Sequence, residues 1–250
     1  MKPLISFAII LILWEILAAG FIPPASRVLL TFAELSYNSE FINNVLISLQ
    51  RLGLGWLAGM ITGTSLGIML ALNLKLRAYL MPVVSALFPI PKIALLPLFL
   101  VLFGLGESGK VTTIFVGGFF PSIIAAYGSV LRTPNQLMDA AASLGASYWQ
   151  TIRLVVVPYN LPSIIQGFRT SLSLSMTLLV AAEMLGAKSG LGYWIFVTGS
   201  DMMFDHMFAG LIYLSLIGVS ANYIINYLRK KLCYWSILEE GKREDIVIKS

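Results

Sequence analysis

Six apolar stretches divide the chain, and each is long enough to cross a lipid bilayer as a helix. A helix needs about 20 apolar residues to span the hydrocarbon core of a membrane. The predicted spans cover residues 4–22, 45–72, 78–103, 111–130, 163–185 and 207–227. Residues 25–44 have the pattern of a short amphipathic helix followed by a polar turn, and the loop 186–206 has room for one more short helix. The pattern predicts an all-α membrane protein with six transmembrane helices.

Small residues and prolines give two of these spans distinct local features. The second span carries a glycine at every fourth position, on one helix face where another backbone can approach closely. These helix-packing glycines are Gly55, Gly59, Gly63 and Gly67. The third span contains prolines 82, 89, 91 and 97, each of which removes a backbone donor. We therefore expect close packing along the second span and a kinked or interrupted third span.

The longest stretch outside the spans, residues 132–162, predicts two short helices. Thr133 is placed to cap the first helix, with Pro134 at the first helical position and Gln136 completing a capping box. Gly145 is placed to end this helix in a left-handed turn. The apolar face of the helix, spaced i, i+3, i+4 and i+7, consists of Leu137, Ala140, Ala141 and Leu144.

A second helix is predicted directly after Gly145. Ser147 and Gln150 repeat the spacing of a capping box. Pro158 and Pro162 are expected to stop this helix before the fifth span. The result is a small helical knob, flanked by membrane segments, whose shape suits docking on something outside the membrane.

Composition and charge place the protein in a membrane and give it an orientation. Of the 250 residues, 58% are hydrophobic and 12% are charged, whereas a soluble domain has roughly 25% charged residues. With the N-terminus inside, most Lys and Arg fall on the cytoplasmic side, as the positive-inside rule requires. Both termini and residues 132–162 are then cytoplasmic, and the net charge of +5 needs no nucleic-acid partner. The basic residues left on the outer side are Arg27, Lys110, Lys188 and, near a span end, Arg51.

The N-terminal residues resemble a secretory signal peptide, with a basic start, an apolar run and small residues. The run is long, however, and the topology needs a first span that starts inside, so we expect it to be retained. No separate soluble domain, low-complexity segment or internal repeat is apparent. We divide the chain into an N-terminal helix with an outer amphipathic segment (1–44), a core membrane domain (45–230) and a cytoplasmic tail (231–250).

Few segments carry residues suited to chemistry. Residues 104–110, GLGESGK, match two glycine-rich nucleotide-binding patterns. A phosphate-binding loop needs a preceding strand and a Ser or Thr after its lysine, where this chain has Val111. His206 has no cluster of metal-ligating neighbours, and Cys233 is interpreted as an interfacial thiol, with lipidation as the alternative. The sequence predicts a non-catalytic protein that binds no cofactor or metal itself.

Three charged residues lie inside predicted spans, where burial of a charge is costly and by default indicates function. Glu15 lies in the peripheral first span and is interpreted as snorkelling or pairing with another helix. Lys92 lies in the proline-broken span, where it could present positive charge to an anionic solute, or snorkel or pair with a neighbour. Glu183 ends the fifth span and is expected to pair with a basic residue and shape the outer gate. Lys92 and Glu183 are thus the candidates for the solute path.

The spacing within residues 139–158 resembles a known family motif. The motif is E-A-A-x3-G-x9-I-x-L-P, and this chain fits its spacing. Asp139, Ala140 and Ala141 are followed after three residues by Gly145, and after nine more residues by VVVP, which ends at Pro158. The stretch resembles the cytoplasmic EAA loop of ABC importer permeases, and it departs from that motif by having Asp in place of Glu and valines in place of Ile and Leu. Matches to the nitrate, sulfonate, taurine and bicarbonate branch of these permeases continue along the chain: IPPAS from Ile22, FPIPKIALLPL from Phe88, FGLG from Phe103, FFP from Phe119, LGAS from Leu144, AEM from Ala182 and SGLGY from Ser189.

This resemblance implies a type I importer fold and a set of partners. Two permease copies, expected to be a homodimer, would pair around a central path. Two cytoplasmic ATPase subunits would hold ATP and Mg²⁺, and a solute-binding protein would deliver solute from outside. Residues 134–146 would form the coupling helix, which sits in a cleft of the ATPase. The ATPase-coupling residues by this resemblance are Asp139, Ala140, Ala141, Leu144, Gly145 and Pro158.

The implied function is that of the membrane-spanning subunit of an ATP-driven importer in a bacterial inner or plasma membrane, in contact with lipid. The expected solute is a small anion such as nitrate, a sulfonate, taurine or bicarbonate, and a neutral or cationic nutrient precursor is the alternative. The rival class is an ion-coupled secondary transporter, which would require inverted repeats, paired broken helices and a midplane acidic site. A membrane scaffold subunit is a third interpretation.

Overall fold

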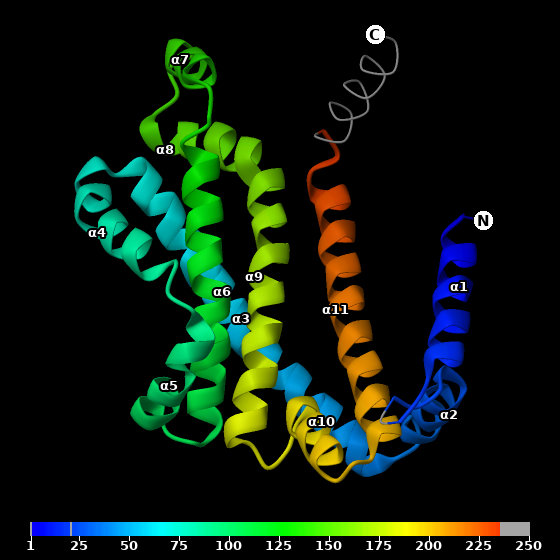
Figure 1. Cartoon of the computed structure of the whole chain (residues 1–250). Helices are drawn as coiled ribbons and strands as arrows, with labels where there is room; N and C mark the ends of the chain where they lie inside the picture. Colours follow the sequence, from blue (N-terminus) through cyan, green and yellow to red (C-terminus); the bar gives the residue numbers. More distant parts are fainter. Residues whose placement is uncertain (1, 21, 236–250) are drawn as a thin grey trace.

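The computed structural model describes residues 2–20 and 22–235, and these residues form helices joined by short links, without a strand (Figure 1). The predicted all-α architecture is therefore confirmed over this part of the chain. Residues 236–250 of the predicted cytoplasmic tail lie outside the described residues. The elements are α1 (Lys2–Leu17), α2 (Ala25–Leu35), α3 (Ser39–Leu72), α4 (Leu74–Leu87), η1 (Lys92–Leu95), α5 (Leu96–Phe103), α6 (Glu107–Val130), α7 (Asn135–Ser143), α8 (Tyr148–Thr151), η2 (Ile152–Val156), α9 (Val157–Gly186), α10 (Leu191–Ser200) and α11 (Phe204–Leu232).

Among the described residues, four helices are long and apolar enough to cross a membrane: α3, α6, the run Tyr148–Gly186 and α11. A fifth span forms if α4 and the segment Lys92–Phe103, which meet at 90°, are counted together. The sequence predicts six spans, whereas the described residues form four spans, or five if the bent pair counts as one. Helix α1 has 16 residues, fewer than the roughly 20 that a span needs, because it ends at Leu17 and the chain turns at Gly20 with a φ of +60°.

Close packing of α3 against α6 forms the centre of the molecule, and the spacing of glycines explains it. Along α3, each of the four glycines predicted to pack helices faces the backbone of α6. A Cβ added at any of them would come within 3.0 Å of a carbonyl oxygen. The glycine and carbonyl pairs are Gly55 with Val111, Gly59 with Phe115, Gly63 with Phe119 and Gly67 with Ile123. Only residues without a side chain allow this approach of two backbones.

Helix α9 completes the core by packing on both α3 and α6. The Ser175 hydroxyl of α9 donates to the carbonyl of Ile114 at 3.1 Å, and both groups are buried. The Trp56 indole of α3 donates to the Ser171 hydroxyl at 2.9 Å. These two bonds pair polar groups across the helices of this trio, whereas the Ser122 hydroxyl of α6 is buried without a hydrogen-bond partner among the described residues. Helices α3, α6 and α9 thus form the core to which α7 is connected at one end and α10 at the other.

The helix that leads into the fifth span is continuous, which corrects the predicted stop at Pro158 and Pro162. Helix α8, the π-helical turn η2 and α9 form one run from Tyr148 to Gly186. Pro158 occupies one of the first two positions of α9, where a missing backbone N–H costs little. Pro162 lies inside α9, as transmembrane helices tolerate when neighbouring groups bind the freed carbonyl.

The predicted short helices outside the core are both confirmed. The amphipathic helix is α2, which lies beside α11 and buries Ala25, Val28, Thr31 and Leu35. The helix within loop 186–206 is α10. The Glu15 carboxylate of α1 accepts hydrogen bonds from the Ser26 backbone N–H at 2.9 Å and hydroxyl at 2.7 Å. Glu15 therefore connects α1 to the start of α2, in line with pairing to another helix.

Candidate functional site

Helix α7 projects at one end of the molecule, beyond the ends of α6 and α9 (Figure 1). It begins one residue later than predicted, with Pro134 as the N-cap and no side chain capping it. The predicted Thr133 cap is wrong, because the Thr133 hydroxyl donates to the carbonyl of Val130 at 2.8 Å and accepts from the Asn160 amide at 2.7 Å. A contact with a distant helix has replaced the local cap.

The turn after α7 has the predicted geometry. Gly145 has a φ of +79°, in the left-handed region that favours glycine. Its backbone N–H donates to Ala142 O at 2.9 Å, and the N–H of Ala146 donates to Ala141 O at 3.0 Å, which together form a Schellman motif. The predicted capping box also forms, with Gln150 N bound to Ser147 Oγ at 3.4 Å and Ser147 N bound to Gln150 Oε1 at 2.7 Å.

The residues predicted to contact an ATPase lie mostly on the open side of α7. Asp139, Ala140 and Gly145 are exposed, and Leu144 is 89% exposed. Ala141 is buried against this chain, and Pro158 is half-buried in α9 rather than in the knob. Further exposed apolar side chains follow in the same loop, namely Tyr148, Trp149 and Leu154. The knob thus presents apolar and small residues that the described part of the chain does not cover.

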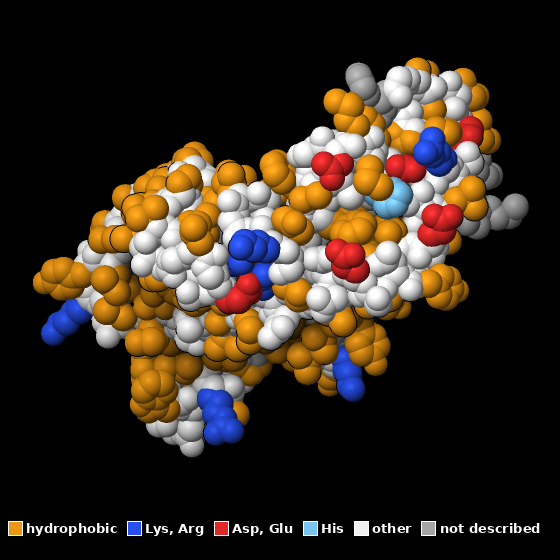
Figure 2. Space-filling view, turned by 90° about the horizontal axis from the view of Figure 1, so that it is seen from below, with side chains coloured by type: hydrophobic (Ala, Val, Ile, Leu, Met, Phe, Trp, Pro, Cys, Tyr) orange, Lys and Arg blue, Asp and Glu red, His pale blue; other side chains and the backbone are white. Residues whose placement is uncertain are grey.

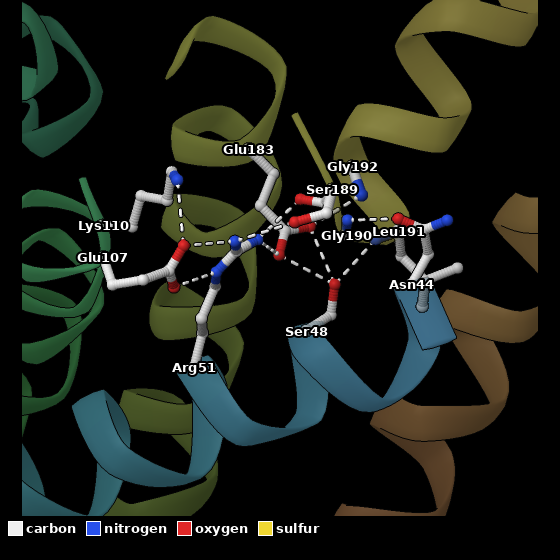
Figure 3. A network of polar contacts seen from close by, with 10 residues as sticks. All are labelled: Asn44, Ser48, Arg51, Glu107, Lys110, Glu183, Ser189, Gly190, Leu191 and Gly192. Carbon is white, nitrogen blue, oxygen red and sulfur yellow. Dashed lines mark hydrogen bonds and ion pairs between the residues drawn. The ribbon is translucent and has the colours of Figure 1, made fainter. Parts of the chain in front are cut away.

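At the opposite end of the molecule, Arg51 of α3 joins α6 and α9 through a polar network that is buried at Glu183 and exposed at Glu107 (Figure 3). Its guanidinium donates to both oxygens of Glu107, at 2.6 and 2.7 Å, and to Glu183 Oε1 at 2.8 Å. It also reaches the carbonyl of Ser189 at 2.7 Å and the hydroxyl at 3.3 Å, so all five donors are used. The predicted pairing of Glu183 with a basic residue is confirmed, and its gating role stays a prediction.

Glu183 and two side chains of α3 also bind the loop that leads into α10. Ser48 Oγ lies 2.8 Å from both oxygens of Glu183, which is fully buried. Gly190 has a φ of +117°, and a Cβ there would collide with Glu183 and Arg51. The bound backbone N–H groups are Gly190 to Asn44 Oδ1 at 2.6 Å, Leu191 to Ser48 Oγ at 2.7 Å and Gly192 to Glu183 Oε2 at 2.8 Å. The buried charge is thus both paired and hydrogen-bonded, as its burial demands.

The glycine-rich segment 104–110 forms the start of α6 and part of this network. Helix α6 begins at Glu107, and the Lys110 ammonium donates to Glu107 Oε1 at 3.1 Å. Lys110 is 5% exposed, so its charge is directed at a carboxylate of this chain. This is the geometry of a helix start, and it differs from a phosphate-binding loop, which follows a strand.

Arg51 and Glu107 are functional candidates that no local sequence pattern connects. A signal was present, because Arg51 is the single charged residue between positions 45 and 72. A lone arginine in an apolar helix needs an acidic partner. The acids at the ends of two other spans, Glu107 and Glu183, supply it.

Lys92 lies where the third predicted span breaks, and backbone carbonyls of this chain bind its ammonium group. Nζ donates to the carbonyls of Leu87 at 2.7 Å, Phe88 at 2.6 Å and Ile90 at 3.0 Å, and it lies 4.9 Å from the centroid of the Phe120 ring. Three donors thus meet three acceptors at the end of α4, where carbonyls lack helical partners. This geometry favours pairing with neighbours, and contact of Lys92 with solute stays a prediction.

The face that carries α2 and α10 is acidic around the single histidine, as Figure 2 shows. Residues 22–40 and 200–206 contain one basic residue, Arg27, whose side chain pairs with Asp205 at 3.2 Å. His206 Nδ1 lies 3.2 Å from the same carboxyl group. No group of three potential metal ligands occurs within residues 2–20 and 22–235. The acidic residues of these two segments are Glu34, Glu40, Asp201 and Asp205.

Cys233 is a buried cysteine directly after α11. Burial raises the pKa of the Cys233 thiol, which favours the neutral and unreactive form. A buried side chain is also a poor acceptor for a lipid, so the interpretation as an ordinary thiol fits this geometry better than lipidation.

Known proteins with similar sequences are transport permeases. Residues 63–233 match the family model of the binding-protein-dependent transport system inner membrane component. SsuC of Bacillus subtilis (strain 168), named as an aliphatic sulfonates transport permease protein, is 32% identical over 247 residues, or 96% of this chain and 90% of SsuC. The taurine transport system permease protein TauC of Escherichia coli (strain K12) is 30% identical over 241 residues, or 92% of this chain and 88% of TauC.

A solved structure shares the fold. It is that of a bacterial alginate ABC transporter in complex with alginate pentasaccharide-bound periplasmic protein, with a TM-score of 0.66. The match covers 93% of this chain and 95% of the other at 15% identity, which shows a common fold alone. The sequence matches give no support to an ion-coupled secondary transporter or a scaffold subunit. The chain belongs to the family of binding-protein-dependent transport system inner membrane components, the non-catalytic permease subunits of ABC transporters.

Proposed function

We propose that this permease imports a small sulfonate or a similar small anion, and that ATPase subunits drive it by docking on α7. Support for the substrate class comes from the two relatives named for aliphatic sulfonates and taurine, which align over about nine-tenths of their own lengths, 90% and 88%. Both kinds of solute carry a sulfonate group. Nitrate, bicarbonate and neutral or cationic nutrient precursors are the alternatives that an uptake assay separates.

The exposure of Leu144 carries the docking proposal. Its side chain is 89% exposed at the tip of a short knob, next to the left-handed turn at Gly145. Burying a leucine side chain in a partner contributes about 1.5–3 kcal/mol. The alanines of α7 leave room for close approach, and the exposed Asp139 carboxylate is free to meet a basic residue of the partner. These features suit a helix that inserts into a cleft of another protein.

We propose that α7 and both termini lie in the cytoplasm, and that the acidic face in Figure 2 lies outside, where a solute-binding protein would dock. Basic residues support this orientation, because they gather at the end of the molecule that carries α7. These residues are Lys75, Arg77, Arg132 and Arg153.

A second copy of the chain is proposed to complete the solute path. In support, an apolar groove of about 530 Å³ lies between α3, α9 and α11, lined by side chains such as Leu52, Trp56 and Ile217. Membrane helices associate through packing of such surfaces. The mass of the purified permease, measured with its bound detergent subtracted, would be that of two chains if this is correct.

The experiment is ATP-driven uptake by the permease in vesicles, together with an ATPase and a solute-binding protein, sought among the genes that neighbour its own. Taurine, ethanesulfonate, nitrate, bicarbonate and a neutral solute are compared. Sulfonate uptake should require all three components and ATP. Uptake of the neutral solute without any anion uptake would contradict the substrate class.

Docking on α7 is tested by Leu144→Ser, which should weaken ATPase binding about tenfold or more and so reduce ATPase co-purification. The melting temperature should not fall, because the side chain is exposed. Val101→Ser is the matched control, since Val101 is 81% exposed on α5, away from α7. The control should retain the ATPase. If Leu144→Ser retained it equally well, the docking surface would have to lie elsewhere.

A further inference from the structure

Three buried polar side chains join the two ends of the loop that carries α7. Asn160 of α9 donates through Nδ2 to Thr133 Oγ1 at 2.7 Å. Ser129 of α6 donates through its hydroxyl to Asn160 Oδ1 at 3.0 Å. Ser129 is 1% exposed, Asn160 is 3% and Thr133 is 8%. These bonds close the base of the loop, because they connect residues 27 and 31 positions apart in the chain.

Every donor of this network has an acceptor. The Asn160 amide also donates to Val156 O at 2.7 Å, and the Thr133 hydroxyl donates to Val130 O at 2.8 Å. The carbonyl of Val156 assigns the orientation of the amide, because a flipped Asn160 would set its oxygen against that carbonyl. A buried polar network that is fully satisfied makes its surroundings rigid and specifies one arrangement.

Helix α7 has few other attachments to the rest of the chain. Ala141 is its one buried residue. The helix is joined to the core through the short links 131–134 and 144–147. Within residues 2–20 and 22–235, the loop makes one further long-range hydrogen bond, from the Tyr148 hydroxyl to Leu72 O at 3.3 Å. Helix α7 also contacts the π-helical turn η2, so a displacement of α7 reaches α9 through this contact and reaches α6 through the base of the loop.

We propose that Ser129, Thr133 and Asn160 form a clamp that turns this loop into a rigid coupling arm, so that a displacement of α7 moves the ends of α6 and α9 together. Without the clamp, the two links bend and the loop absorbs the displacement. The proposal rests on the proposed docking of an ATPase on α7. The three residues lie outside the EAA pattern of residues 139–158, and they act as positioning residues for transport.

Asn160→Leu tests the clamp, because leucine has a similar volume and removes every hydrogen bond of the amide. The complex of permease, ATPase and solute-binding protein is placed in vesicles, and solute uptake and ATP hydrolysis are both measured. We expect the ATPase to remain bound and ATP to be hydrolysed, while the solute taken up per ATP falls about tenfold. Thr133→Val should lower the same ratio less, and the double variant should be no worse than Asn160→Leu alone.

The matched control is Thr113→Val. Thr113 is fully buried in α6, and its hydroxyl donates to Gly109 O of the same helix at 2.8 Å. The variant therefore removes a buried hydrogen bond that does not connect two helices. It should keep the original ratio of uptake to ATP hydrolysis. A purely structural role of Asn160 would lower the melting temperature and leave this ratio unchanged.

A second measurement uses the permease alone and does not depend on where an ATPase docks. Hydrogen exchange of peptides covering residues 131–147 should become about tenfold faster in Asn160→Leu and stay unchanged in Thr113→Val. Unchanged exchange would overturn the clamp, and an unchanged uptake-to-ATP ratio or a lost ATPase would overturn its coupling role. If the docking proposal alone is wrong, the exchange would still rise. Thr133→Val serves for both measurements if Asn160→Leu does not fold.

Discussion

Arg51 Nη1 and Glu183 Oε1, which belong to residues 132 positions apart, lie 2.8 Å from each other with both side chains shielded from solvent. Removing two charges from water costs several kcal/mol per ion, and here the surrounding hydrogen bonds offset that cost. The pair connects α3 to the end of α9 beside the loop into α10 (Figure 3). This end of the helix trio is therefore held by charge, whereas its middle is held by backbone contact.

Arg51→Leu is expected to destabilise the protein by about 3–5 kcal/mol, because it leaves Glu183 as a buried charge without a counter-ion. The melting temperature of the detergent-solubilised permease measures the loss. Arg27→Leu is the matched control, since Arg27 is 69% exposed in its pair with Asp205 and should change stability by less than about 1 kcal/mol. Equal decreases in melting temperature in the two variants would show that the buried ion pair stabilises the protein no more than the exposed one.

Gly59→Ala is expected to destabilise the protein by about 1–3 kcal/mol, because the new methyl group meets the carbonyl of Phe115 and forces α3 away from α6. Gly53→Ala is the control on the same helix. A Cβ there has nothing within 4 Å, and alanine should stabilise a helix interior by about 0.5–1 kcal/mol. Opposite shifts of the melting temperature are the expected result, and a stable Gly59→Ala would argue against backbone contact.

Gly145→Asp should reduce ATP-driven uptake about tenfold or more while the protein remains in the membrane, because it adds a charge to the proposed docking surface. Gly145→Asn isolates that charge. Both side chains tolerate the left-handed conformation, and a Cβ at this position has nothing within 4 Å. Asn should therefore retain most of the uptake. Normal transport by the Asp variant at normal expression would contradict the role of α7 as a lever.

Lys92→Met is expected to lower stability, because the carbonyls of Leu87, Phe88 and Ile90 lose a charged donor, and a hydrogen bond to a charged group contributes about 1.5–3 kcal/mol. Melting temperature and the concentration dependence of anion uptake are compared between Lys92→Met and Lys92→Arg. Lys92→Arg keeps the charge and should lose less stability. An unchanged melting temperature with a raised KM for anions in Lys92→Met would instead support the solute contact predicted from the sequence.

The features that could be predicted from the sequence are those determined by near neighbours in the chain. The capping box of Ser147 and Gln150 and the left-handed turn at Gly145 depend on residues within one helical turn. The glycine spacing of α3 predicts which face of the helix packs closely. That α6 is the helix packed on this face is known only from the structure.

The predictions that failed involve contacts between distant segments. Thr133 does not cap α7, because Asn160, 27 residues away, binds its hydroxyl. Pro158 does not stop a helix, because the π-helical turn before it leads directly into α9. Arg51 needs a partner on physical grounds, but only the packing of three helices selects Glu107 and Glu183.

The spacing of the glycines in α3 limits how α3 and α6 can move relative to each other. Each glycine faces one carbonyl, and the next equivalent position lies four residues away, or about 6 Å along the axis. A smaller slide would drive the side chains of α3 into the backbone of α6. The two helices are therefore confined to discrete registers, and we expect them to move as one rigid body when the permease changes conformation.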